Sequence, residues 1–496
     1  MTRGRWVTWL WPIAIVLAIG AVALRFVRAP SDLPPIRPHA IQAPTAPIAS
    51  FKVDIPYEDA KPILDAHRNN LPDELKGKTS DELQAAWPGW VARHNAEIRA
   101  RLERGDEDSI VNFWLYGTTF TNLPRATAQA IAKLGDRSRA EDLLVGRLNA
   151  LVESIASPGA PGTNDRLRFA RQVIERHGID PTTGAGKEQA RVYLVQARAR
   201  MIAENSRHSR TAQTANQLTD RRAKLAAYAT LYADRGLSSD TSLSADFALD
   251  HAFEGIKSQG TLAAGSVRRV AIVGPGLDFT DKAEGYDFYP QQTIQPFAVI
   301  DSLVRLELAK PDDLHVTTFD LSPRVNRHLE DAVRRAQRDP YVLQLPLTSD
   351  DASHQWNPDL VRYWQQVGSA IGDETQAMAA PSSAGDVRVR AVRVRAEVVR
   401  SIVPRDVNIV LERLEALRAD DRFDVIVATN ILVYYDAFEQ ALALANVSKM
   451  LRPGGFFLTN YAVSPSAPME STASLVTSVE FDRQHNGDTL FWYRRR

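Results

Sequence analysis

The pattern of apolar and polar positions changes near the middle of this 496-residue chain. From about residue 56 to 255, apolar side chains such as Trp90, Ile98 and Leu102 recur at helical spacing. From residue 266 onward, short apolar runs alternate with helical stretches. Strands that alternate with helices indicate βαβ units and a mostly parallel sheet. We therefore expect a helical domain over 56–255 and an α/β domain over 266–496.

The N-terminus has a different pattern. No charged side chain stands between Trp6 and Leu24, and an apolar run of that length predicts a transmembrane helix. We expect a single-pass membrane anchor over residues 1–28 and a proline-rich spacer over 29–55. A signal peptide cut after Ala23 is the alternative interpretation. The flanking arginines are nearly balanced, so the positive-inside rule does not set the orientation.

Composition excludes several classes of function. Lys+Arg and Asp+Glu number 60 each, so no net charge draws the chain to nucleic acid, and we expect no nucleic-acid partner. The chain has no cysteine, which excludes disulfides and thiol catalysis. The histidines lack metal-ligand spacing, and we infer no metal site. Arginines at 388, 390, 393 and 395 largely alternate with valines, which favours the solvated face of an edge strand over a phosphate-binding site.

Candidate chemistry lies where the predicted strands end. The first strand, Val270–Val273, ends in Gly274-Pro275-Gly276, and glycines let a ligand approach the main chain closely. Later strands end at Asp320, at Glu412 and at Thr429-Asn430. Ligands of parallel sheets bind beyond the carboxyl ends of the strands, so we expect these residues at one edge. Asp320 is placed there to accept hydrogen bonds from ribose hydroxyls.

The C-terminal end of the chain indicates which ribose-containing ligand the sheet edge would bind. Residues 450–455 read Met-Leu-Arg-Pro-Gly-Gly, and runs at 475–481 and 489–493 predict a closing antiparallel hairpin. With the glycine turn and Asp320, these features resemble the class I S-adenosylmethionine-dependent methyltransferases over roughly residues 266–494. The resemblance implies a Rossmann-like, mostly parallel sheet with an antiparallel C-terminal strand. It also implies S-adenosylmethionine as the cofactor and an unidentified molecule as the methyl acceptor.

Residues 424–436 are similar to the chemoreceptor protein-glutamate methyltransferases, as is the segment Asp320-Leu321-Ser322. The resemblance implies that Gly274 and Gly276 flank the methionine part of the cofactor, that Asp320 holds the ribose, and that Asn430 and Tyr434 lie near the methyl group. The predicted cofactor-binding set is Gly274, Gly276, Asp278, Asp320, Leu321, Glu412, Thr429 and Asn430. The residues predicted to steer or deprotonate an acceptor are Tyr434, Tyr435 and Asp436. Asp278 either faces the cofactor's ammonium group or caps the turn.

The chain also departs from the pattern. Gly276 and Asp320 stand 44 positions apart, against the ~20 expected between a glycine turn and the ribose acid. We therefore expect insertions near 277–314 and 349–386. The aromatic segment Tyr286–Thr293 either covers the cofactor or packs on the helical domain.

Two other functions stay open. One is a non-catalytic, membrane-tethered scaffold with a degenerate methyltransferase fold. The other is an NAD-dependent oxidoreductase, which is disfavoured because Phe279 occupies the third glycine position of G-x-G-x-x-G. Since S-adenosylmethionine is made in the cytosol, an active enzyme should keep residues 266–496 on the cytoplasmic side.

Overall fold

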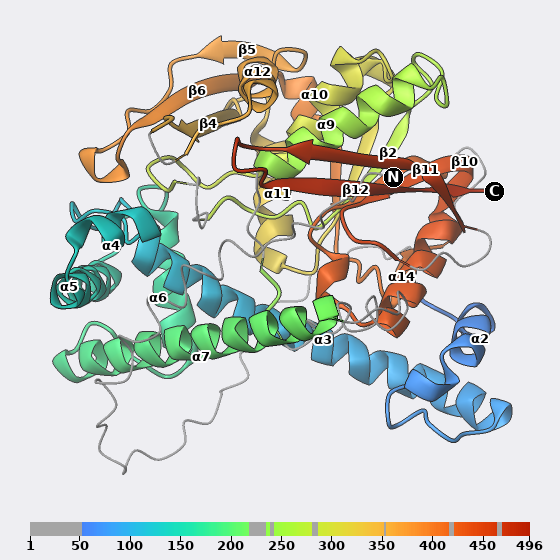
Figure 1. The fold of residues 1–496 in the computed structure, drawn as a ribbon, viewed down its shortest axis with the longest axis horizontal. Coiled ribbons are helices and arrows are strands. Elements are labelled where there is room, and N and C mark those ends of the chain that lie inside the picture. The colour runs from blue at the N-terminus through green and yellow to red at the C-terminus, as the bar shows by residue number, and fades with distance from the viewer. Residues whose placement is uncertain are drawn as a thin grey trace.

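The computed structural model describes residues 52–217, 235–238, 243–279, 286–351, 354–415, 421–463 and 469–496 (Figure 1). The predicted membrane anchor and most of the spacer lie outside these residues. Within the described ranges, no helix combines the length and the apolar character that a membrane crossing requires.

One large sheet organises the C-terminal half. Its strand order is β11 (Met469–Glu480), β12 (Gly487–Arg495), β10 (Leu451–Thr459), β9 (Phe423–Ala428), β2 (Arg269–Val273), β3 (His315–Phe319) and β7 (Ile402–Arg405). The strands from β10 to β7 run parallel, and β12 is antiparallel to both of its neighbours. All six residues of β9 are buried, as expected where helices cover both faces of a parallel sheet. The predicted α/β fold with a reversed strand near the C-terminus is confirmed.

The helices of this half follow from the strand order. The crossovers carry α10 (Gln295–Arg305) between β2 and β3, α11 (Pro323–Arg335) after β3, and α14 (Ala437–Met450) between β9 and β10. The chain leaves β2 toward β3 on one side and returns to β9 on the other, so the switch point lies beside β2. Helix α9 (Leu243–Ser258) packs on α10, β11 and β12, although its residues fall in the range predicted for the helical domain.

The helical domain contains α3 (Ser80–Tyr116), α4 (Ala128–Leu134), α5 (Arg137–Ala156), α6 (Asp165–Arg176) and α7 (Gly184–Gln217). Figure 1 shows α3 passing below the sheet and linking the two halves. Its first half buries Trp90 against Phe438 of α14, with ring centroids 5.8 Å apart. Its second half buries Ile110 and Phe113 in the core that α5, α6 and α7 share. The two halves of the molecule therefore share one long helix.

The N-terminal described residues belong to the sheet domain. Strand β1 (Lys52–Asp54) pairs antiparallel with β8 (Glu412–Leu414), and α2 (Tyr57–Ala66) packs on α14.

The remaining short elements are η2 (Arg68–Asn70), η3 (Pro311–Asp313), η4 (Ser382–Ala384), η6 (Leu432–Tyr434) and α13 (Ala396–Arg400).

A second, antiparallel sheet lies between α11 and β7 in the chain. It consists of β4 (Val342–Thr348), β6 (Val387–Val394) and β5 (Gly372–Thr375), with α12 (Pro358–Gln366) between β4 and β5. Strand β6 carries three of the four alternating arginines and is the central strand, so the prediction of an edge strand is wrong. Arg388 and Arg390 instead lie over the ring of Trp364, at 5.3 and 5.7 Å. Stacking on an aromatic face keeps these two cations at the sheet surface.

Candidate functional site

The glycine turn after β2 requires glycine for two reasons. Gly274 and Gly276 have φ of 67° and 66°, in the left-handed region that other residues rarely adopt. A Cβ added to Gly274 would also stand 2.1 Å from Cδ1 of Ile431, which follows β9. The Gly274 N–H donates to the carbonyl of Phe319 at 2.8 Å. The turn is thus fixed between the ends of β3 and β9.

Asp320 follows β3 and faces this turn. Its carboxylate accepts hydrogen bonds from the backbone N–H groups of Ser322, at 2.7 Å, and of Gly276. The residue is 8% exposed. Burial raises the pKa of Asp320 to about 6, against the opposing effect of these two N–H groups. The structure therefore brings together the predicted ribose acid and the predicted glycine turn.

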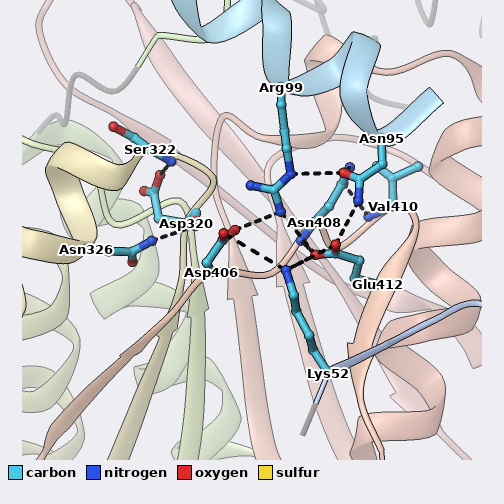
Figure 2. A network of polar contacts seen from close by, with 10 residues as sticks. All are labelled: Lys52, Asn95, Arg99, Asp320, Ser322, Asn326, Asp406, Asn408, Val410 and Glu412. Carbon is cyan, nitrogen blue, oxygen red and sulfur yellow. Dashed lines mark hydrogen bonds and ion pairs between the residues drawn. The ribbon is translucent and has the colours of Figure 1, made fainter. Parts of the chain in front are cut away.

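Asp406, which the sequence reasoning missed, directly follows β7, the strand beside β3. Phe319 and Arg405 are register partners in β3 and β7, so Asp320 and Asp406 follow adjacent strand ends. The Asp406 carboxylate is 2.8 Å from Arg99 of α3 and 4.0 Å from Lys52 of β1 (Figure 2). The only sequence signal was an acid after a four-residue strand, which is too short and too polar to recognise by its pattern.

Glu412 lies in the same network but is committed to internal partners. Its carboxylate accepts from Lys52 at 3.2 Å, from Asn95 at 2.7 Å, from Arg99 at 3.3 Å and from the backbone N–H of Asn408 at 2.7 Å (Figure 2). These bonds tie β1 and α3 to the start of β8 and to the loop before it. Cofactor binding by Glu412 stays a prediction, and the structure gives this residue a bracing role.

The end of β9 holds two predicted residues in fixed orientations. Thr429 is buried, and its hydroxyl accepts from Gln295 of α10 at 2.7 Å. Asn430 has φ of 58°, and its backbone N–H donates to the side chain of Asn460 at 2.8 Å. Asn460 in turn donates to Asn430 at 2.6 Å and to Asp488 at 3.1 Å. Left-handed backbone at a non-glycine residue costs roughly 1–3 kcal/mol and is found preferentially at functional sites.

The three predicted acceptor-side residues have different surroundings. Tyr435 is buried in the sheet-domain core, and burial raises its pKa well above the usual value. Asp436 caps α14 and forms a capping box with Glu439. Tyr434 and Asp436 are half-buried, and the carbonyl of Tyr434 accepts from Arg101 at 2.9 Å. Tyr435 and Asp436 thus have defined places in the fold, and contact of any of the three with an acceptor stays a prediction.

Asp278 and the aromatic segment form one unit. The Asp278 carboxylate accepts from the Tyr289 hydroxyl at 2.6 Å and from Gln292 at 3.1 Å. The Asp287 carboxylate accepts from the backbone and hydroxyl groups of both Thr118 and Thr119. Of the two interpretations of the segment, packing on the helical domain matches these contacts. Asp278 holds the segment to the turn, as in the capping interpretation.

Two further predictions concern Leu321 and the absence of a metal site. Leu321 is half-buried and packs against the core below the sheet edge. Within the described part of the chain, no three His, Asp or Glu side chains are arranged to hold a metal ion.

A parallel sheet with one reversed strand near its C-terminal edge carries a glycine turn after its first strand and an acid after its second. This arrangement matches the Rossmann-like, mostly parallel sheet with a reversed strand that the sequence resemblance implies. No family model and no curated protein matches the chain.

Solved methyltransferases are similar to the chain only remotely. Glycopeptide N-methyltransferase MtfA with bound S-adenosylmethionine is 14% identical, with a TM-score of 0.20, over 50% of this chain and 65% of that protein. N-methyltransferase NodS from Bradyrhizobium japonicum WM9 is 13% identical (TM-score 0.22, 50% of this chain and 96% of NodS). The CurJ carbon methyltransferase is 10% identical (TM-score 0.22, 84% and 98%). Because these TM-scores are so low, the description of the fold rests on the strand order alone.

Proposed function

We propose that this protein is an S-adenosylmethionine-dependent methyltransferase that transfers the methyl group by direct displacement. One observation carries the proposal: the carboxylate of Asp320 faces the glycine turn at the switch point of the sheet. The buried Asp320 carboxylate accepts from two backbone N–H groups, and a carboxylate can accept further hydrogen bonds. The two hydroxyls of a ribose would supply them, and charge-assisted bonds of this kind contribute about 1.5–3 kcal/mol each.

The residues at this edge fit the cofactor in distinct ways. Gly274 and Gly276 let the main chain approach the ligand, and Asp320 would hold the ribose. Asn430, fixed by Asn460, would lie beside the methyl group, as the sequence resemblance implies. Bound S-adenosylmethionine supplies a methyl carbon made electrophilic by its sulfonium. The protein's task is then alignment, which lowers barriers by roughly 7–11 kcal/mol in well-oriented systems.

The acceptor side of the site needs few catalytic groups. Direct displacement needs a general base only where the acceptor must lose a proton. Tyr434, the half-buried tyrosine that follows β9, would orient the acceptor rather than deprotonate it. A carboxylate or neutral amine acceptor fits this arrangement.

Titration of the purified chain with S-adenosylmethionine and with NADH tests the proposal. We expect saturable binding of S-adenosylmethionine that Asp320→Ala abolishes, and none of NADH. Asp312→Ala, at an exposed acid before β3, is the control and should bind as the wild type does. Tight NADH binding would indicate the oxidoreductase, and no binding of either ligand would indicate the scaffold. Labelled cofactor with cell extract would then reveal the acceptor.

We also propose that the predicted anchor over residues 1–28 holds the enzyme at the membrane with its catalytic domain in the cytoplasm. Support comes from the sequence pattern and from the need for a cytosolic cofactor. Protease added outside sealed spheroplasts should leave the C-terminal domain intact, and digestion of that domain would contradict this orientation.

A further inference from the structure

A single arginine of the helical domain holds the segment that continues the glycine turn. Arg166 of α6 is 4% exposed. Its guanidinium donates to the backbone carbonyls of Asp278 at 2.9 Å, of Phe279 at 2.5 Å, of Asp287 at 3.0 Å and of Tyr289. These carbonyls belong to two limbs of chain, 278–279 and 287–289. One cation from a distant helix thus clamps both limbs.

Further contacts anchor the same limbs in the helical domain. The ring of Phe279 is buried against Phe113 of α3 and Phe169 of α6, with ring centroids 5.5 Å apart in both pairs. Asp287 is held by Thr118 and Thr119 at 2.5–3.0 Å. Side chains from α3, α6 and the loop after α3 therefore surround the segment.

The limbs are connected to the cofactor turn by short bonds. Asp278 stands two residues after Gly276, and its carboxylate binds Tyr289 and Gln292. The hydroxyl of Thr293 donates to the carbonyl of Pro275, within the turn, at 3.2 Å. A shift of the limbs would therefore move the Gly276 N–H that faces Asp320.

We propose that Arg166 is a positioning residue for the cofactor site, through which the helical domain sets the glycine turn against Asp320. The proposal rests on the proposed function and gives the helical domain a defined role in it. Guanidinium presents five N–H donors in a rigid fork, and four carbonyls accept from it here. Lysine has three donors around one atom and cannot span both limbs.

Arg147 of α5 provides a matched control. It is also buried, and its guanidinium also donates to four carbonyls, those of Trp114, Gly117, Leu123 and Pro124. All four lie within the helical domain. Loss of either arginine leaves buried carbonyls without donors, so both substitutions should destabilise the chain. Arg147 acts on the segment only indirectly, through its charge near Asp287, so only the loss of Arg166 removes hydrogen bonds from the two limbs.

The experiment compares Arg166→Lys, Arg166→Gln and Arg147→Gln in the full chain. Melting temperature reports stability, and calorimetric titration with S-adenosylhomocysteine reports the cofactor site. We expect the Arg166 variants to bind roughly 10- to 100-fold more weakly. Arg147→Gln should keep wild-type affinity at a similar loss of stability. Wild-type affinity in a folded Arg166 variant, or an equal loss in Arg147→Gln, would overturn the proposal.

Hydrogen exchange separates this proposal from the proposed function. In Arg166→Lys, amides of residues 274–279 and 286–293 should exchange faster than in the wild type, and in Arg147→Gln they should not. This result is expected even if the wild type binds no S-adenosylhomocysteine, an outcome that would reject the methyltransferase function alone. Unchanged exchange in Arg166→Lys would reject the clamp. If no Arg166 variant folds, Asp287→Asn loosens the same limb and should raise its exchange rate.

Discussion

Asp320 and Asp406 end paired parallel strands, and the charge of Asp406 adds to burial in raising the pKa of Asp320 to about 6. Asp406 is itself held by Arg99 of α3 and Lys52 of β1. The electrostatics of the proposed ribose acid therefore depend on α3 and β1, far away in the sequence.

Cofactor binding should weaken in acid. Ribose hydroxyls are held best by the ionised carboxylate, and Asp320 becomes protonated as the pH falls through about 6. Affinity for S-adenosylhomocysteine should be constant above pH 7 and should fall by up to about tenfold per unit below pH 6. Calorimetry between pH 5 and 8 measures this. A flat profile would show that the ionised carboxylate does not take part.

Asp320→Asn should be more stable than the wild type while losing cofactor affinity. The folded-state pKa of Asp320 is raised, so its contribution to stability is lost as the pH rises from the ordinary value of 3.8 through about 6. The cost at pH 7 is of order 3 kcal/mol at most, and asparagine removes it. Chemical denaturation at pH 7 and at pH 4 should show a gain at pH 7 only. Equal effects at both values would contradict this explanation.

Gly274→Ala should destabilise the chain more than Gly135→Ala does. Both glycines have positive φ, 67° and 64°, but only Gly274 has a neighbour, Ile431 Cδ1, in the way of a Cβ. We expect about 1–2 kcal/mol for backbone strain at either position and a further ~1–3 kcal/mol of overpacking at Gly274. Denaturant unfolding measures both losses. Ile431→Ala should recover the second part, and a double mutant with no recovery would contradict the packing argument.

Arg99→Met should weaken cofactor binding without contact between Arg99 and the cofactor. Arg99 forms ion pairs with the carboxylates of Asp406 and Glu412. Its removal leaves more uncompensated negative charge near Asp320, which raises the pKa of Asp320 further. The pH at which S-adenosylhomocysteine affinity is half lost should therefore move upward. Arg93→Met, at an exposed arginine of the same helix paired with Glu74, is the control. An unchanged pH midpoint in Arg99→Met would refute the coupling.

The sheet could be predicted from the sequence because its signals are local. Val270–Val273 and Phe423–Ala428 are apolar runs that end at glycine or polar residues, and their alternation with helices sets the class of fold. The meeting of Gly276 and Asp320 followed from parallel strands ending at one edge. The proposed cofactor rests on a resemblance over four short motifs.

The contacts of Glu412 and of Arg166 could not be predicted from the sequence, since both depend on segments far apart in the chain. Glu412 looks like a strand-end ligand until Lys52 and Arg99 are seen to bind it. Asp436 looks like a polar site residue, but its spacing to Glu439 makes a capping box. That signal was readable in the sequence and was overlooked. Arg166, by contrast, gave no signal, because its partners are backbone carbonyls more than 100 positions away.

A crystal structure of the full chain with S-adenosylhomocysteine tests the central claim most directly. The account predicts both ribose hydroxyls within about 2.6–3.2 Å of the Asp320 carboxylate, above the Gly274–Gly276 turn. A ligand whose ribose lies away from Asp320, or crystals grown with saturating ligand that show none at this edge, would contradict it.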